Sequence, residues 1–188
     1  NYFEDTPTRR IKGKFDELSK IRKYRESVPD WLDALGEQEL GEALWTDELH
    51  SLNSLAPVVL RVNTLKISRD RLQQLLREEG VESYPLQQYS DALQLVERSN
   101  IFKSQSFKDG LFEVQDASSQ KVAPFMQIDN SVKRIIDTCA GAGGKTLHLA
   151  TLLQNKGQII AMDIYEQKLQ ELKRRARRNG VFNIETKL

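Results

Sequence analysis

The stretch that decides the fold runs from residue 134 to residue 163 and reads RIIDTCAGAGGKTLHLATLLQNKGQIIAMD. It contains a hydrophobic strand, a glycine-rich loop, an apolar helix and a second hydrophobic strand that ends in Asp163. This order predicts a doubly wound α/β domain with parallel strands. We expect strands at 133–139, 157–163 and 182–188, and helices at 145–154 and 165–178. The expected buried helix positions are Leu147, Ala150, Leu153, Leu169, Leu172 and Ala176.

The glycine-rich loop fits neither of two common phosphate-binding patterns. A P-loop needs a glycine five positions before Gly144 of the Gly-Lys-Thr triplet, and that position is Cys139. This argues against a nucleotide hydrolase. The dinucleotide fingerprint Gly-x-Gly-x-x-Gly begins at Gly141 and Gly143 but has Thr146 in place of its third glycine. What remains is a turn that lets the backbone approach a ligand, followed by the free N–H groups of a helix N-terminus.

An acid at the end of the second strand indicates what the ligand contains. Asp163 follows Gly143 by about twenty residues, the spacing at which an acid accepts hydrogen bonds from ribose hydroxyls in nucleotide-binding units. A cofactor with a ribose but no pyrophosphate suits this loop, and that cofactor is S-adenosylmethionine. The plainer alternative is a tight strand-to-helix turn, with Asp163 merely solvated at a strand end.

Four stretches resemble the Sun/Nop family of RNA cytosine-C5 methyltransferases. Residues 137–146, DTCAGAGGKT, are similar to that family's first motif, D-x-C-A-A-P-G-G-K-T, with Gly-Ala in place of Ala-Pro. PDWL at 29–32, LRVNT at 60–64 and EVQDASS at 113–119 agree in the family's order. The resemblance implies S-adenosylmethionine-dependent methylation of C5 of cytosine in RNA, with ribosomal RNA as the expected substrate. The cofactor contacts that it implies are Cys139, Ala140, Gly141, Ala142, Gly143, Gly144 and Lys145, with Asp163 on the ribose.

The chemistry of this reaction requires a cysteine nucleophile. Carbon 5 of cytosine is a poor nucleophile until a thiolate adds to carbon 6 and forms an enamine that attacks the methyl sulfonium. The only cysteine is Cys139, in a loop where the resemblance assigns no nucleophile, and we expect it to be a buried small hydrophobe. The family's cysteine-bearing motifs would lie beyond Leu188. We therefore assign no catalytic residue and expect these 188 residues to bind cofactor without methylating RNA by themselves.

Composition narrows the class of protein. A hydrophobic content of 39% and a charged content of 29% are typical of a globular protein. A single cysteine excludes an internal disulfide and fits a cytoplasmic location. No apolar run is long enough to span a membrane, and His50 and His148 have no partners at metal-ligand spacing, so no metal is expected. The chain begins with Asn1, so a targeting segment or another domain can precede it.

Two basic clusters lie behind a net charge of +1. Residues 9–25 carry eight Lys and Arg, and residues 168–178 carry six. Such clusters indicate either a phosphate-backbone partner, here RNA, or a solvated helix face. For the second cluster we favour a helix face, because Glu171 and Arg175 can pair at i,i+4. For the first cluster both interpretations stay open.

The patterning divides the chain into three expected parts. Residues 1–55 form a basic arm and helical segment, which is loose through residue 13. We expect one helix that starts at Lys14, a second that ends at Gly36 and a third that ends at Asn53. Trp31 and Trp45 are expected in the core. Residues 56–128 form a small α+β domain like an RNA-recognition fold, and residues 129–188 form the first half of a Rossmann-like domain. A parallel sheet that stops there would leave an exposed edge, so we expect low stability or association through that edge.

In the middle part we expect strands at 58–62, 92–96 and 111–114. We also expect two helices, one with Ser68 as its N-cap and a short one near 101–107. Arg61 and Asn63 share one strand face, either as RNA contacts or as ordinary surface residues. The aromatic signature of base-stacking strands is absent. The next helix has Asp116 or Ser118 as its N-cap and directs Val122, Phe125 and Met126 to the core. The alternative function is a non-catalytic RNA-binding module with a vestigial cofactor loop.

Overall fold

The computed structural model describes residues 8–129 and 131–188, with backbone only for residues 8–10. The chain forms two compact units, one through Ala56 and one from Pro57. Residues 1–7 and Asn130 lie outside the described part. The expected turn at 129–130 and the expected loose segment at 1–13 are therefore described only in part. The further division of the second unit between residues 128 and 129 remains a proposal.

The first unit is helical. Its helices are α1 (Thr8–Leu18), α2 (Arg22–Arg25), α3 (Asp30–Leu40) and α4 (Glu42–Asn53). The expectation of a loose segment through residue 13 is wrong from Thr8 onward, because α1 passes through Gly13. The expected helix end at Gly36 is also wrong, because α3 continues to Leu40 and Gly41 follows at φ +79°.

Packing against a tryptophan explains the glycine inside α3. A Cβ atom at Gly36 would lie 2.3 Å from the indole ring of Trp45, so only glycine lets α3 and α4 approach there. Trp45 is buried and donates its indole N–H to Asp33 Oδ1 at 2.9 Å. Trp31 is 66% exposed, so the prediction of a core position holds for Trp45 and is wrong for Trp31.

Ion pairs neutralise much of the basic cluster in this unit. Arg22 binds Asp33 at 2.8 Å and also binds Glu37. Lys23 binds Asp30 at 3.0 Å. These contacts fasten α2 to α3, so part of the cluster serves packing within the unit.

The second unit opens with a four-stranded antiparallel sheet of order β2-β3-β1-β4. Leu60 in the central strand β1 (Val59–Val62) pairs with Leu93 of β3 (Ala92–Leu95) and with Val114 of β4 (Phe112–Val114). Helix α5 (Arg69–Glu78) begins at its N-cap Ser68, and α6 (Gln105–Lys108) follows the 3-10 turn η1 (Ile101–Lys103). The β-α-β-β-α-β order is the ferredoxin-like arrangement. The short strand β2 (Ser83–Pro85) was not predicted, because three residues ending in proline carry no alternating pattern.

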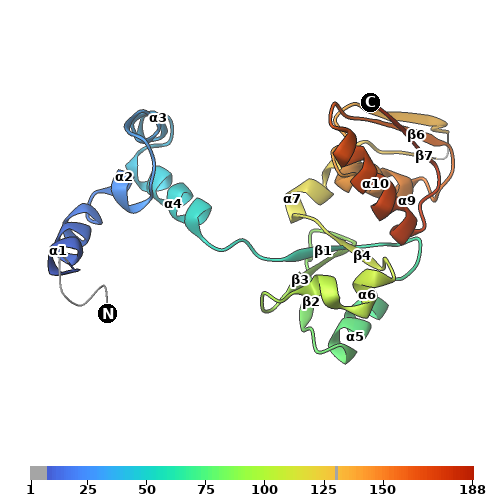
Figure 1. Cartoon of the computed structure of the whole chain (residues 1–188), viewed down its shortest axis with the longest axis horizontal. Helices are drawn as coiled ribbons and strands as arrows, with labels where there is room; N and C mark the ends of the chain where they lie inside the picture. Colours follow the sequence, from blue (N-terminus) through green and yellow to red (C-terminus); the bar gives the residue numbers. More distant parts are fainter. Residues whose placement is uncertain (1–7, 130) are drawn as a thin grey trace. The chain divides into compact units, whose positions relative to one another are not determined.

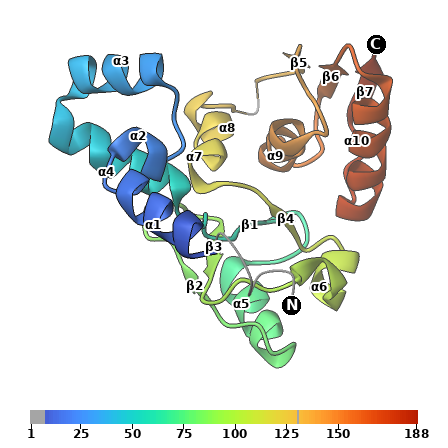
Figure 2. The same cartoon turned by 60° about the vertical axis from the view of Figure 1, so that its left-hand side comes forward.

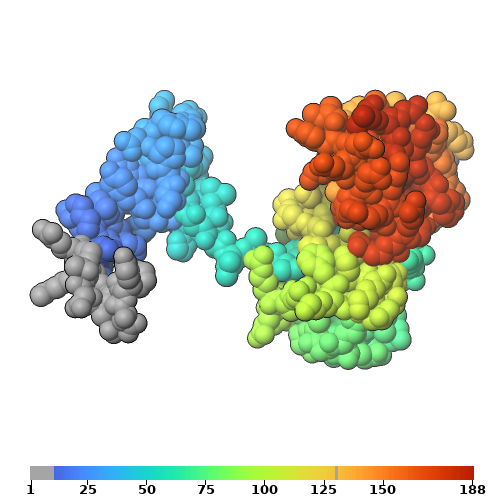
Figure 3. Space-filling model, in the orientation of Figure 1, coloured from blue at the N-terminus to red at the C-terminus, as the bar shows by residue number. Residues whose placement is uncertain are grey.

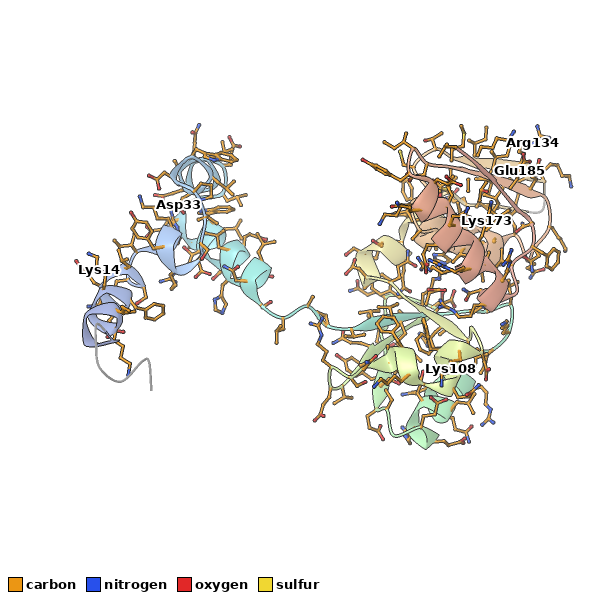
Figure 4. All side chains as sticks on the ribbon, in the orientation of Figure 1. Lys14, Asp33, Lys108, Arg134, Lys173 and Glu185 are labelled. Atoms are coloured by element: carbon orange, nitrogen blue, oxygen red, sulfur yellow. The ribbon has the colours of Figure 1, made fainter. Side chains whose placement is uncertain are left out.

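A three-stranded parallel sheet follows, in the order β5-β6-β7. Its strands are β5 (Arg134–Asp137), β6 (Gln158–Met162) and β7 (Ile184–Lys187), connected by α9 (Gly144–Leu152) and α10 (Glu166–Asn179). All six helix positions expected to be buried are buried. Figure 4 shows Arg134 and Glu185 at the same end of this sheet, where Gln158 links them through hydrogen bonds of 3.1 and 2.8 Å. In the described part of the chain β5 is an edge strand, and its Ile136 is 59% exposed.

Two short helices connect the sheets, α7 (Ala117–Gln120) and α8 (Val122–Phe125). Asp116 is the N-cap of α7, since its Oδ1 accepts the Ser119 N–H at 3.1 Å. The prediction that Val122, Phe125 and Met126 face the core is wrong, because they are 43%, 87% and 52% exposed. The chain forms two separate turns here instead of one continuous helix, which changes the phase of the apolar residues.

The four-stranded sheet separates two sets of helices in this unit. Figures 1 and 2 both show α5 and α6 on one face and α7, α9 and α10 on the other. The space-filling view shows the elements of both sheets forming one continuous surface (Figure 3). The face of β1 that is turned away from α5 is therefore covered. No helix in the described ranges is long and apolar enough to cross a membrane.

Candidate functional site

The glycine-rich loop lies between β5 and α9. Gly141 and Gly143 adopt φ values of +53° and +87°, the left-handed region that favours glycine. The Gly143 N–H donates to Ala140 O at 2.9 Å, and the Ala140 N–H donates to Met162 O at 2.9 Å, which joins the loop to β6. A Cβ at Gly143 would lie 2.6 Å from Leu172, whereas one at Gly141 would contact nothing within 4 Å. Gly141 therefore faces open space and Gly143 faces the protein.

Asp163 fastens the loop to the end of the second strand. Its Oδ2 accepts the Gly141 N–H at 2.8 Å, and its Oδ1 accepts the Tyr165 N–H at 3.0 Å. A carboxylate has about four lone-pair sites, so each oxygen keeps acceptor capacity. The side chains that follow, Ile164 and Tyr165, are apolar and 82% and 63% exposed. The structure thus brings Asp163 beside the loop, next to exposed apolar surface that the sequence pattern did not single out.

The two ends of the loop motif are joined by a hydrogen bond that was not predicted. The Thr146 hydroxyl donates to Asp137 Oδ2 at 2.7 Å, and the Cys139 N–H reaches Oδ1 of the same carboxylate at 3.4 Å. This closes the loop over the start of α9. The first amides of α9, at Gly144 and Lys145, have no acceptor within the helix. No acceptor for them is found among the described residues either, so they are available as donors to a ligand.

Cys139 is exposed, so the expectation of a buried small hydrophobe is wrong. The reason is the edge position of β5, which leaves the end of that strand uncovered. Cys139 and Lys145 line a pocket of about 220 Å³ together with Met126 and Ile136. The pocket lies along the exposed edge of the sheet.

Two arginines hold the loop from the protein side. Arg61 is 3% exposed, and its Nη1 donates to Gly144 O at 2.7 Å and to Gln115 Oε1 at 2.8 Å. Arg175 Nη1 donates to Ala142 O at 2.7 Å. Burial lowers the pKa of Arg61 to about 10, so this guanidinium keeps its charge at neutral pH. The ferredoxin-like sheet and α10 thereby fix two carbonyl groups of the candidate cofactor loop.

Arg61 and Asn63 are therefore neither RNA contacts nor surface residues, which corrects both alternatives. Asn63 is 5% exposed, and its Nδ2 donates to Gly110 O at 2.8 Å and to Asn179 O at 2.9 Å. Arg61 lies in β1 and Asn63 directly follows this strand, and both side chains reach the helices of the second sheet, Arg61 at α9 and Asn63 at α10. Their partners are far away in the sequence, so no local pattern could have identified them.

A buried carboxylate organises the neighbouring charges. Glu113 in β4 is 3% exposed, binds Arg175 at 2.8 Å and also binds Arg178 and Asn179. Burial raises the pKa of Glu113, but Arg175, Asn179 and Arg178 together outweigh it and hold this pKa below its ordinary value. The expected i,i+4 pair between Glu171 and Arg175 is wrong, since Glu171 binds Arg174 instead.

The second basic cluster, residues 168–178, thus contains both paired, partly buried side chains and exposed ones. Arg175 and Arg178 are half-buried in contacts with Glu113, whereas Lys168, Lys173 and Arg177 are exposed on α10. Figure 4 labels Lys173 on this helix. Over residues 8–129 and 131–188, no three His, Cys, Asp or Glu side chains are grouped as metal ligands.

Two family models match the sequence. Residues 28–102 match the ferredoxin-like domain of RsmF/B-like methyltransferases, and residues 126–187 match the 16S rRNA methyltransferase RsmB/F. Ribosomal RNA small subunit methyltransferase B from Klebsiella pneumoniae subsp. pneumoniae is 35% identical over 153 residues. That match covers 81% of this chain and 35% of the relative. The chain thus spans about a third of the length of the curated relatives that it matches.

Solved structures agree with these matches. A methyltransferase homolog protein from Pyrococcus horikoshii is 28% identical, with a TM-score of 0.80 over 88% of this chain and 54% of the other. NSun6 from the same organism, solved with SFG, shares the fold at 19% identity, with a TM-score of 0.75 over 85% of this chain and 65% of that one. The family models, the relatives and the ferredoxin-like and Rossmann-like sheets show that the chain belongs to the Sun/Nop family of methyltransferases.

Proposed function

We propose that this chain is the cofactor-binding part of an S-adenosylmethionine-dependent methyltransferase that acts on C5 of cytosine in ribosomal RNA. The observation that carries the proposal is the contact between Asp163 and Gly141, at 2.8 Å, which places an acid beside a glycine turn and a helix N-terminus. The relatives' names, which specify methylation of small-subunit ribosomal RNA, support the substrate.

The loop has the features that S-adenosylmethionine requires. Residues 139–145 would contact the cofactor mostly through backbone groups, with open space beside Gly141. Asp163 would accept the ribose hydroxyls with its remaining lone pairs, as an acid does at this position in nucleotide-binding units. The exposed side chains of Ile164 and Tyr165 would pack against the adenine. The bound cofactor supplies a methyl group on a sulfonium.

The RNA partner is supported by the exposed cations of α10 and by the relatives. The target base has to leave its stack to reach the cofactor. Cys139 is the only cysteine in the sequence, and we assign it no catalytic role, so these residues alone are expected not to transfer the methyl group. Ribosomal RNA as substrate and the single cysteine support a cytoplasmic location. The open edge at β5 is the proposed surface for association.

Calorimetric titration with S-adenosylhomocysteine tests the cofactor site. We expect the wild-type chain to bind. Asp163→Ala should weaken binding by about 10-fold to 100-fold, because a hydrogen bond to a charged group contributes about 1.5–3 kcal/mol. Glu82→Gln, which removes an exposed charge just before strand β2, is the matched control and should bind normally.

A chain that is folded by circular dichroism and does not bind would contradict the proposal. Salt-dependent RNA binding by such a chain would instead favour a non-catalytic RNA-binding module.

A further inference from the structure

A second pocket lies in this unit, apart from the cofactor loop. It has a volume of about 250 Å³ and lies between the loop that precedes β3, helices α7 and α8, and the middle of α9. Neither the loop residues 139–145 nor Asp163 lines this pocket. Its lining residues are Gln88, Tyr89, Ser90, Asp91, Gln120, Lys121, Pro124, Phe125 and His148.

His148 is a buried polar side chain without a partner in this pocket. It is 3% exposed, and neither of its ring nitrogens has a hydrogen-bond partner in the described part of the chain. Burial, with a smaller contribution from the charge of Arg61, lowers the pKa of His148 to about 3. The ring is therefore neutral and offers one N–H donor and one acceptor. Buried polar groups are normally satisfied, so an unpartnered imidazole in the wall of a pocket marks this place as a candidate binding site.

Aromatic rings and a cation complete the pocket. Phe125 is 87% exposed, and Tyr89 has the Lys121 ammonium 5.0 Å from its ring centroid. The backbone of Tyr89 is fixed, because Arg69 Nη1 donates to Tyr89 O at 2.8 Å. Rings that stack, together with a cation that can meet phosphate, are the features that bind a single unstacked nucleotide of RNA.

We propose that this pocket holds one unstacked base of the RNA substrate, with the His148 ring in the wall against which that base lies. The inference depends on the proposed function for its choice of RNA. Phe125 and Tyr89 stack on the base, and Lys121 meets the phosphate. The Asp91 carboxylate lines the same pocket, so a base with an amino group is preferred to uracil.

The two histidines of the chain make a direct test possible by NMR. The ring nitrogens are labelled with ¹⁵N, and cytidine, adenosine and uridine monophosphates are titrated separately. We expect a saturable shift of the His148 ring nitrogens with the amino-bearing nucleotides, and a smaller shift with uridine monophosphate. His50, exposed on α4, should not shift and serves as the internal control.

Two variants separate this pocket from other nucleotide sites. Phe125→Ala should weaken binding by about 10-fold, a typical loss when one stacking ring is removed. Phe182→Ala removes a ring that is 81% exposed elsewhere on the same unit, and it should have no effect. A His148 resonance that does not shift would overturn the proposal, as would a shift that is unchanged in Phe125→Ala.

The same samples distinguish failure of this inference from failure of the proposed function. If S-adenosylhomocysteine binds and His148 does not respond to nucleotides, the base pocket is wrong and the cofactor site stands. If His148 responds and the cofactor analogue does not bind, the base pocket stands and the methyltransferase proposal is wrong.

Discussion

Replacing Glu113 by glutamine tests whether the ferredoxin-like sheet supports the proposed cofactor loop. The glutamine keeps the shape of the side chain but removes the negative charge that binds two arginines. The side chains of Arg175 and Arg178 are only 17% and 21% exposed, so both charges would stay largely buried without the carboxylate that they bind. Breaking one partner of a buried ion pair costs about 3–5 kcal/mol. We expect a loss of about 3 kcal/mol in the free energy of unfolding, because the amide retains some hydrogen bonding.

Urea unfolding of the second unit measures this loss. Glu82→Gln is the control, since its ion pair with Arg77 is 3.6 Å long and its side chain is 61% exposed. Such a surface pair contributes about 0–1 kcal/mol. A double-mutant cycle with Arg175→Met isolates the coupling between Glu113 and Arg175.

The change should also reach the proposed cofactor site. Arg175 binds Ala142 O at 2.7 Å, so losing the carboxylate that positions Arg175 should weaken binding of S-adenosylhomocysteine by several-fold. Equal stability losses in Glu113→Gln and Glu82→Gln, or additive effects in the cycle, would show that Glu113 does not stabilise the unit through Arg175. Weakened stability with unchanged cofactor affinity would show that the network supports the fold but not the loop.

Three further predictions follow from burial and backbone geometry. Burial lowers the pKa of His148 from 6.5 to about 3, so between these values the unfolded chain binds a proton that the folded chain does not. Stability should fall by about 2 kcal/mol from pH 7 to pH 5, and less in His148→Leu, as measured by urea unfolding at each pH. Gly143→Ala places a Cβ on a residue with φ of +87° and 2.6 Å from Leu172, so it should lower the free energy of unfolding by about 2–4 kcal/mol. Gly141→Ala should cost about 1 kcal/mol, because its φ of +53° faces open space, and equal losses would contradict this account. Trp45→Ala should lower the free energy of unfolding of the first unit by about 3–5 kcal/mol, as measured by thermal unfolding. Trp31→Ala should change it by less than about 0.5 kcal/mol, and the reverse order would show that the assignment of the core is wrong.

Local spacing was sufficient to predict the second sheet. Strand, glycine turn, helix and strand follow one another within thirty residues, and the apolar positions of α9 and α10 repeat at helical spacing. The proximity of Asp163 to Gly141 follows from the same order, because parallel strands bring their carboxyl ends to one edge.

Contacts between distant residues were not predictable in this way. Arg61 binds a carbonyl 83 residues later, and Glu113 binds an arginine 62 residues later, so neither pair leaves a periodic signal. The exposure of Cys139 depends on which strand lies at the edge of the sheet, which a single sequence does not reveal. The charge of Glu113 within an otherwise apolar strand was the one available sign of a buried network.

An amide map by NMR tests directly whether residues 139–145 and Asp163 hold S-adenosylmethionine, as we propose. The backbone amides are assigned by NMR, and S-adenosylhomocysteine is added to saturation. We expect the largest shifts at Gly141, Gly144, Lys145 and Asp163, with small changes along the ferredoxin-like sheet. Shifts concentrated elsewhere, or no shifts in a chain with a dispersed, folded spectrum, would contradict it.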